Sequence, residues 1–387
     1  MRALHLTMSA PDIAPEDVAL VNEVLRSPSL SGGPMVERFE ADWCAHFGVP
    51  HAVAVSSGTA GLHLALIAAG VTSGDLVITS AFSFVASANA ALYEGAVPVF
   101  VDIDPVTLNI DPLAVADALE GAAKPVKVVL PVHVFGRPAA MGTIVSAADR
   151  HGALVIEDAC EAPGAEYEGR PVGSFGAASV FGFYPNKQIT TGEGGLIVTK
   201  DAEWARLFRS LRNQGRDDDG TWLRHVRLGY NYRLDEMSAA LGVAQLRRFD
   251  ELLARRAHVA ALYASHLQSI EGLTLPPPVP PSTRASWFVY VVRLAADVDR
   301  DTVMTALAAV GVPSRPYFSP IHLQPLYRAR FGYRGGEFPV TEAIARTTLA
   351  LPFHGKLSEG EIDHVASCLA DAMAVARRRS VPAGVPA

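Results

Sequence analysis

Short apolar runs alternate with alanine-rich stretches between about residues 53 and 200, and this alternation limits the folds open to the chain. In the first alanine-rich stretch, GTAGLHLALIAAG, Leu62, Leu66 and Ala69 recur at helical spacing. Because the runs are apolar nearly throughout, each is expected to be a strand buried on both faces. The pattern predicts an α/β fold with a mostly parallel central sheet covered by helices. The apolar runs are HAVAVS, DLVITS, VPVFVDI, KVVLPVHV, ALVIEDA, SVFGFY and GGLIVT.

The chain has 387 residues, which is too long for one small core, so two domains are expected. A long helical region is predicted from Asp235 to Ile270, and the segment LPPPVPPSTRAS then breaks the pattern. Beyond it, WFVYVVRL and two helical stretches near DRDTVMTALAAVG and SEGEIDHVASCLADAMAVA indicate a small α+β domain. We therefore place a large domain, with the N-terminal segment included, at residues 1–250 and a small C-terminal domain at residues 251–387.

Composition excludes several classes of function. A net charge of −7 argues against nucleic acid as the main partner, because phosphate binding requires a basic face. No stretch offers about 18 uninterrupted apolar residues, so no membrane span is expected. Cys44, Cys160 and Cys368 show neither metal-ligand spacing nor a disulfide framework, which suits a reducing cytoplasm. The DDDG run at residues 217–220 is interpreted as a solvated loop, and no metal site is predicted.

One predicted strand delivers the motif SSGTAGLHLAL to the start of a helix. Ser57, Gly58 and Thr59 would lie where free N–H groups and the positive end of the helix dipole favour a phosphate. Gly58 lets the backbone approach closely, and Thr59 adds a hydroxyl donor. A plain Ser/Thr helix cap is the alternative for this motif.

Two further features lie at the ends of other predicted strands. The run LVIEDA ends with Glu157 and Asp158, and ligands of open α/β sheets bind at the carboxyl ends of strands. A carboxylate there could bind a cationic ring nitrogen, or it could cap a helix or form a structural ion pair. Phe84, in SAFSFVAS, could either stack on a planar ligand or belong to the core.

Lys187 stands in an unusual setting for a lysine. In FGFYPNKQITTGEGG it follows an aromatic run and precedes a Thr–Gly turn, so it is expected on a bend at the edge of the buried sheet. A surface lysine with a buried stem is the alternative. A phosphate cradle, a stacking aromatic ring, a buried aspartate and a lysine at a turn are together the parts that hold pyridoxal 5′-phosphate (PLP). Burial would disfavour the charged amine, which suits a lysine that forms a Schiff base.

In their order along the chain and in their residues, these motifs resemble those of the DegT/DnrJ-type sugar aminotransferases, which are fold type I PLP-dependent enzymes. The resemblance covers nearly the whole chain and implies a fold type I PLP-dependent transferase with a large and a small domain. The motifs that carry it are LSGGPMVERFE, SSGTAGLHLAL, PVHVFGRPAAM, IEDACEAPGAEYEGRPVGSFG, LGYNYRLDEMSAALGVAQL and SRPYFSPIHLQPLY, with the lysine segment among them.

The resemblance implies a role for each motif residue. Lys187 is similar to the Schiff-base lysine, and Asp158 is similar to the carboxylate that keeps the pyridine nitrogen protonated. Gly58 and Thr59 are similar to phosphate ligands. Phe84 is similar to the residue that stacks on the ring.

Asn231, in GYNYRL, is similar to an asparagine that reaches the cofactor phosphate from the neighbouring subunit, which implies a homodimer with shared active sites. Two positions depart from the family pattern. Gly182 stands where members often carry a serine that helps to hold the phosphate, so one phosphate contact is in question. Glu161 stands where members often carry glutamine near the cofactor's 3-oxygen. An ionised carboxylate repels a phenolate, so Glu161 is expected to be protonated, turned away or paired.

The implied reaction transfers an amino group, usually from L-glutamate, to a keto group of a nucleotide-linked sugar, with pyridoxamine 5′-phosphate as the intermediate form of the cofactor. Lys187 would also shuttle the proton between the cofactor and the carbon next to nitrogen. The diphosphate of such a substrate requires cationic groups near the pocket mouth. Arg233, Arg315 and His322 are the candidates, and a structural role is the alternative for each.

Three other functions fit parts of the pattern. A PLP- or pyridoxamine-phosphate-dependent sugar dehydratase of the same family would carry histidine in place of Lys187. A non-catalytic regulatory protein on the same fold is opposed by the joint presence of Lys187, Asp158 and Thr59. An aminotransferase that acts on a free keto-cyclitol is compatible with every residue named above.

Overall fold

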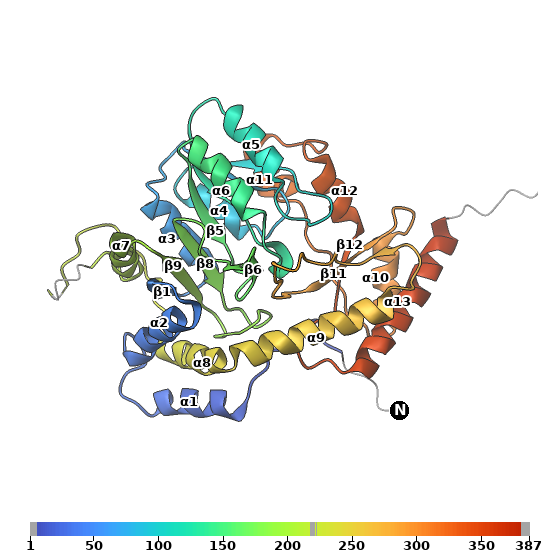
Figure 1. Cartoon of the computed structure of the whole chain (residues 1–387), viewed down its shortest axis with the longest axis horizontal. Helices are drawn as coiled ribbons and strands as arrows, with labels where there is room; N and C mark the ends of the chain where they lie inside the picture. The colour runs from blue at the N-terminus through green and yellow to red at the C-terminus, as the bar shows by residue number, and fades with distance from the viewer. Residues whose placement is uncertain (1–5, 217–220, 222, 381–387) are drawn as a thin grey trace, which may run out of the picture.

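The computed structural model describes residues 6–216, 221 and 223–380, so the aspartate run at residues 217–220 lies outside the described residues. At its centre is a seven-stranded sheet in the order β1-β9-β8-β5-β4-β2-β3 (Figure 1). Strand β9 is antiparallel to β1 and β8, and the remaining pairs are parallel. The predicted mostly parallel sheet is therefore confirmed. The strands are β1 (His51–Val55), β2 (Leu76–Ser80), β3 (Val97–Val101), β4 (Val126–Leu130), β5 (Leu154–Asp158), β8 (Ala178–Gly182) and β9 (Gly195–Thr199).

Helices cover both faces of the sheet, as strands without polar faces require. Helices α3, α4 and α7 pack on one face, while α5 and α6 cover one half of the other face and α2 and α8 cover its second half. Strand β1 shows why both faces are covered. Its side chains alternate, so Val53 and Val55 pack with α3, α4 and α7, whereas Ala52 and Ala54 pack with α2 and α8 on the opposite face. The helices are α2 (Pro34–Phe47), α3 (Gly58–Ala68), α4 (Ala86–Tyr93), α5 (Pro112–Glu120), α6 (Met141–Arg150), α7 (Ala202–Arg212) and α8 (Glu236–Arg247), with α1 (Pro15–Leu25) packed outside α8.

A second core forms around a small antiparallel sheet in the order β10-β11-β12. Helix α9 joins the two cores and runs beneath both parts of the molecule in Figure 1. Its residues Phe249 and Leu252 belong to the cluster of α2 and α8, whereas Val259 and Tyr263 belong to the cluster of β11 and α13. The core therefore changes within α9, close to the predicted boundary at residue 250. These elements are α9 (Phe249–Leu267), β10 (Leu273–Thr274), β11 (Tyr290–Leu294), α10 (Arg300–Ala309), β12 (Thr348–Leu351) and α13 (Glu359–Ser380).

The structure adds three details that the sequence patterns did not indicate. The predicted helix from Asp235 to Ile270 is two helices, with Arg248 at the junction of α8 and α9. Leu6, near the N-terminus, packs in the second core. Tyr327, late in the chain, packs against the large sheet near Phe100. The remaining elements are β6 (Glu166–Tyr167), β7 (Arg170–Pro171), η1 (Val134–Gly136), η2 (Ile321–Leu323), α11 (Pro325–Phe331) and α12 (Pro339–Thr347).

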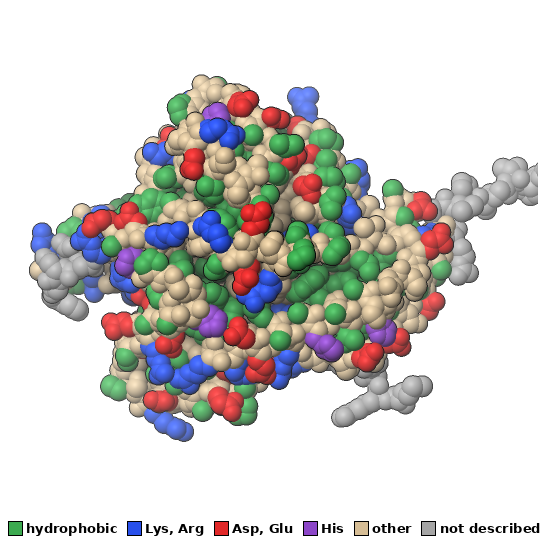
Figure 2. Space-filling view, viewed as in Figure 1, with side chains coloured by type: hydrophobic (Ala, Val, Ile, Leu, Met, Phe, Trp, Pro, Cys, Tyr) green, Lys and Arg blue, Asp and Glu red, His purple; other side chains and the backbone are tan. Residues whose placement is uncertain are grey.

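The surface carries charge of both signs. Basic and acidic side chains are interspersed over the face in Figure 2. Within the described residues, no helix has the length and apolar character that crossing a membrane requires. The three cysteines are free thiols.

Candidate active site

A cavity of about 480 Å³ lies at the edge of the large sheet where the parallel strands end. Because β9 runs the opposite way, its first residue, Gly195, pairs with the last residues of β1 and β8, Val55 and Gly182. All the sequence-predicted cofactor residues except Asn231 line this cavity. They are Gly58, Thr59, Phe84, Asp158, Glu161, Gly182 and Lys187.

The N-terminus of α3 forms one end of the cavity. Ser57 is the helix cap, since its side chain accepts a hydrogen bond from the Ala60 N–H at 3.0 Å. Gly58 and Thr59 follow it into the cavity wall. A Cβ at Gly58 would lie 2.6 Å from the Cys160 Sγ, so only glycine fits here without displacing a neighbour. The bare backbone and the positive end of the helix together suit a phosphate.

The Cys160 thiol fills the space beside Gly182. A Cβ at Gly182 would lie 3.3 Å from the Cys160 Cβ and 3.5 Å from its Sγ. Burial, with the Asp158 charge as the second cause, raises the pKa of Cys160 well above its ordinary range, so the thiol is neutral. A serine at residue 182 would therefore pack tightly against the Cys160 side chain.

Asp158 is the last residue of β5, and two hydrogen bonds fix its carboxylate. Oδ2 accepts from the Ser87 Oγ at 2.6 Å, and Oδ1 accepts from the Cys160 N–H at 3.1 Å. The residue is 4% exposed and lines the cavity. These contacts fix a carboxylate in position to hold a cationic ring nitrogen.

Glu157, its neighbour on the same strand, has a structural role. Its carboxylate accepts from three N–H groups of the loop at residues 173–176 and from the Ser179 hydroxyl. Burial would raise the pKa of Glu157, but the hydrogen bond and charge of His133, together with the loop N–H groups, hold it below its ordinary value. Side chains alternate along a strand, so one carboxylate faces the cavity and the other holds the loop.

Lys187 lies in the turn between β8 and β9 with its side chain only 13% exposed. Its Nζ is 3.7 Å from the centre of the Phe288 ring and 3.9 Å from the Glu161 Oε1. The lysine is therefore a half-buried group at a bend, and its amine lies against the cavity wall.

Glu161 faces Lys187 across the cavity wall. Its Oε2 accepts from the Phe135 N–H at 2.8 Å, which fixes the carboxyl group in place. Burial raises the pKa of Glu161 to about 7, with the Asp158 charge adding to the rise and Lys187 and the Phe135 N–H opposing it. Of the three expected outcomes, the structure favours a carboxyl group that is close to Lys187 and protonated below about pH 7.

Aromatic rings form much of the remaining wall. Phe84 lies just before α4 and is 60% exposed, so its ring is available for stacking on a planar ligand. Tyr184, Phe288, Tyr317 and Phe318 line other parts of the cavity. These rings come from both halves of the chain, so residues beyond position 250 complete the cavity.

Three of the predicted contact residues lie outside this wall. Asn231 is exposed and pairs through its backbone with Asn213. Arg233 donates from Nη1 to the Asn213 Oδ1 at 3.0 Å. Arg315 is exposed and donates to the Ser314 carbonyl. Asn231 therefore cannot serve the cavity of its own chain in this conformation.

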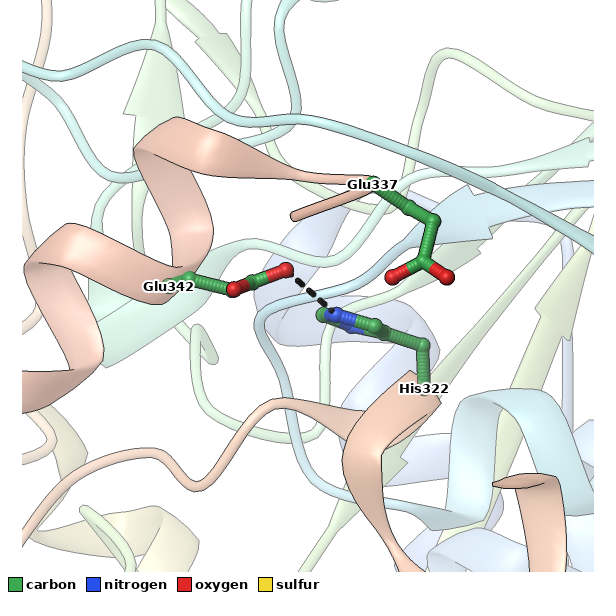
Figure 3. Close-up of side chains that lie close together, drawn as sticks. All are labelled: His322, Glu337 and Glu342. Carbon is green, nitrogen blue, oxygen red and sulfur yellow. Dashed lines mark hydrogen bonds and ion pairs between the residues drawn. The ribbon is translucent and has the colours of Figure 1, made fainter. Parts of the chain in front are cut away.

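His322 has a different place from the expected one at the pocket mouth. It is 0% exposed, it does not line the cavity, and its Nε2 lies 3.1 Å from the Glu342 Oε1 (Figure 3). Glu337 lies beside this pair, close enough for the three side chains to offer ligand atoms to a metal ion. However, the same Glu342 oxygen also accepts from the N–H groups of Gly336 and Phe338, so its lone pairs are already used. The contacts favour a loop-holding role over substrate or metal binding.

The sequence analysis missed several residues that build the site. Ser87 holds Asp158, Phe288 lies under Lys187, and Arg256 and Gln188 hold the lysine turn. Gln188 and Ser87 carried a local signal, because Gln188 adjoins Lys187 and Ser87 ends the motif that contains Phe84. Arg256 and Phe288 come from distant segments whose local patterns are those of ordinary helix or core residues.

The donor set of the cavity fits PLP. A helix N-terminus without a Cβ at Gly58 suits the phosphate, Asp158 suits a protonated ring nitrogen, and the Lys187 amine lies over the Phe288 ring. Together with the seven-stranded sheet, this site defines a fold type I PLP-dependent transferase.

The profile of the DegT/DnrJ/EryC1/StrS aminotransferase family matches residues 11–370, and the chain belongs to this family. It is 39% identical over 369 residues to the GDP-perosamine synthase of Caulobacter vibrioides, covering 94% of this chain and 97% of that one. Helicobacter pylori PseC, an aminotransferase of pseudoaminic acid biosynthesis, superposes with a TM-score of 0.89 at 28% identity, covering 96% of this chain and all of PseC. A Streptococcus pneumoniae protein solved in its PLP-form superposes with a TM-score of 0.91 at 25% identity, covering 98% of this chain and 100% of that one. The chain is a sugar aminotransferase of the PLP-dependent class.

The contact between Gly182 and Cys160 yields a first prediction. Gly182→Ser alone should bind PLP no better than wild type, because the new Cβ would pack tightly against the Cys160 side chain. Gly182→Ser combined with Cys160→Ala should bind PLP about tenfold more tightly than Cys160→Ala, since a hydrogen bond to a charged group contributes on the order of 1.5 kcal/mol. Fluorescence titration of the apoenzymes with PLP measures this. Equal affinity of the double variant and Cys160→Ala would contradict the packing argument.

The raised pKa of Glu161 yields a second prediction, for the apoenzyme. Its pKa rises from an ordinary value of 4.5 to about 7 on folding, so between these pH values the folded state binds more protons than the unfolded state. The carboxyl group therefore costs increasing stability as pH rises through this window. Glu161→Gln does not titrate, so its Tm relative to wild type should rise between about pH 4.5 and 7 and then level off.

Differential scanning fluorimetry across this pH range measures the difference. Glu193→Gln removes an exposed carboxyl group at the same cavity and is the matched control against which the change in Glu161→Gln is compared. Parallel Tm curves for wild type and Glu161→Gln would show that Glu161 does not titrate in this window.

Proposed function

We propose that this sugar aminotransferase moves an amino group from L-glutamate to a keto group of a nucleotide-linked sugar. The observation that carries the proposal is that the Lys187 amine, the Asp158 carboxylate and the N-terminus of α3 meet in one cavity. No metal takes part in the proposed reaction. Three free cysteines and a charged surface suit the cytoplasm, where we place the enzyme.

Each residue of the cavity has a task in this reaction. Bound PLP supplies an electron-withdrawing ring that stabilises negative charge on the carbon next to the transferred nitrogen. Gly58 and Thr59 would hold the phosphate, and Phe84 would pack against the ring. Asp158, fixed by its two hydrogen bonds, would keep a proton on the ring nitrogen. Lys187 would bind covalently at rest and, once released as an amine, would carry a proton to or from the reacting carbon.

The acceptor is the finer part of the proposal. The similar GDP-perosamine synthase is named for a nucleotide-linked sugar, and this supports the same acceptor class here. Arg315 lies two residues before the cavity residue Tyr317, which makes it the preferred candidate for the diphosphate, with Arg233 as a second candidate. Lys187 speaks against a dehydratase, and Asp158 in the same cavity speaks against a regulatory protein. A free keto-cyclitol is the alternative acceptor.

We further propose a homodimer in which the Asn231 side chain contacts the phosphate in the partner's cavity. Asn231 is exposed and does not line the cavity of its own chain. The preceding loop exposes Leu223, Val226 and Leu228, with Leu228 82% exposed. Grouped apolar side chains on a surface are typical of protein contacts. These two observations support a subunit interface at this loop.

A third prediction tests the reaction and the acceptor together. Wild-type enzyme loaded with PLP, given L-glutamate and a panel of keto-sugar nucleotides and keto-cyclitols, should yield an amino sugar nucleotide by mass spectrometry. Borohydride should fix the cofactor to the peptide that contains Lys187, since its amine is the nucleophile of the cavity. Lys187→Ala should lose the covalent link and nearly all turnover.

Lys200→Ala is the matched control, because Lys200 is exposed and bonded to the Ser174 carbonyl. It should behave as wild type. Reductive labelling of another lysine would refute the role of Lys187. Product from keto-cyclitols alone would overturn the proposed acceptor class but leave the aminotransferase chemistry standing.

The fourth prediction concerns the shared site. Lys187→Ala and Asn231→Asp should each be inactive, the latter because a carboxylate would repel the phosphate. Mixed under conditions that exchange subunits, they should regain activity, since a mixed dimer contains one site with both residues intact. Activity measured before and after exchange tests this. Unchanged inactivity after exchange has been proven by native mass spectrometry would mean that each site is built from one chain.

A further inference from the structure

Arg256 joins two segments of the cavity wall from behind. It lies on α9, is 4% exposed and donates to four backbone carbonyls. Its Nη2 donates to Asn186 at 3.0 Å and to Lys187 at 2.6 Å, and its Nη1 donates to Trp287 and Phe288 at 3.2 Å each. One guanidinium group thus connects the turn that contains Lys187 to the segment that contains Phe288, whose ring lies beneath the lysine amine.

A cation in this position is unusual. Burial lowers the pKa of Arg256 to about 10, so it is still charged at neutral pH. Among residues 6–216, 221 and 223–380, no carboxylate lies within ion-pair distance of it, whereas its neighbour Arg255 pairs with Asp12 and Glu251. The four hydrogen bonds offset only part of the cost of burying this charge, because burial still lowers its pKa, whereas an apolar side chain of similar size would carry no such cost. Stability alone therefore does not account for an arginine here.

A second side chain, that of Gln188, also holds the lysine turn. The Gln188 Nε2 donates to the Glu161 carbonyl at 2.7 Å and to the Ser286 Oγ at 2.9 Å. With Arg256, this fixes residues 186–188 between the end of β5 and the entry to the small domain. The Lys187 Nζ then lies 3.7 Å from the centre of the Phe288 ring. A guanidinium group suits this task because its planar fork carries five donors in a rigid arrangement, which an ammonium group lacks.

We propose that Arg256 is a positioning residue for the amino transfer, because it holds the backbone on both sides of the Lys187 amine and thereby sets where that amine can move its proton. Arg256 touches neither substrate nor cofactor in this role. The inference rests on the role of Lys187 proposed above. It concerns the rate of proton movement and not the affinity for the amino donor.

The test compares Arg256→Lys and Arg256→Met with wild type, all loaded with PLP. Rapid mixing with L-glutamate, followed by the visible absorption of the bound cofactor, reports the first half-reaction. The maximal rate should fall by about 10- to 100-fold in both variants, as expected for a reacting group displaced by about 1 Å. The half-saturating glutamate concentration should change little. Arg255→Met, the adjacent surface arginine of α9, is the matched control and should keep the wild-type rate.

Thermal unfolding and the bound cofactor content correct each rate to the folded, loaded fraction. A merely structural role would lower the Tm but leave the corrected rate unchanged, and this result would overturn the proposal. If Arg256→Met fails to fold, Arg256→Lys, which keeps the charge and a long stem, decides the question.

Borohydride labelling of wild type separates the positioning role of Arg256 from the proposed role of Lys187. Label on another lysine refutes the role of Lys187 and this inference with it, while label on Lys187 with unchanged rates in Arg256→Lys refutes only the positioning role.

Discussion

Parallel pairing of β2, β3, β4, β5 and β8 brings the carboxyl ends of these strands to one edge of the sheet, and the remaining features of the site depend on this arrangement. A parallel sheet requires crossover connections, so its strands are joined through helices that cover its faces. The start of α3 and the end of β5 therefore meet at the same edge. The turn between β8 and the reversed strand β9 adds Lys187 to the same cavity as Asp158 at the end of β5 and Gly182 at the end of β8.

Three carboxyl groups near this edge differ because their surroundings differ. Glu157 accepts five hydrogen bonds and is held ionised as a loop anchor. Asp158 accepts two and faces the cavity. Glu161 accepts one backbone hydrogen bond in a buried position, and its pKa rises to about 7. The number of donors that compensate for lost hydration thus separates a structural carboxylate from one that titrates near neutral pH.

Much of the fold could be predicted from the sequence, because strands buried on both faces leave near-continuous apolar runs and their covering helices leave the 3.6-residue period. The order of motifs also led to Lys187, Asp158, Gly58 and Phe84, all of which line the cavity. Other features could not be predicted in this way. The break at Arg248 divides a stretch whose helical pattern is continuous, and His322 is buried against Glu342 although its motif lies near the cavity segment at residue 317.

The sequence by itself determined the class of fold, the chemistry of the cavity residues and the family, since these depend on residue types at short spacing along the chain. Only the tertiary structure decided the surroundings of those residues. The crowding of Gly182 by Cys160, the raised pKa of Glu161 and the four carbonyls bound to Arg256 all join segments that lie far apart in the chain or are brought together only by folding. The physical reason is that burial and hydrogen-bond partners are set by packing between elements, and local sequence patterns do not encode which distant segments will meet.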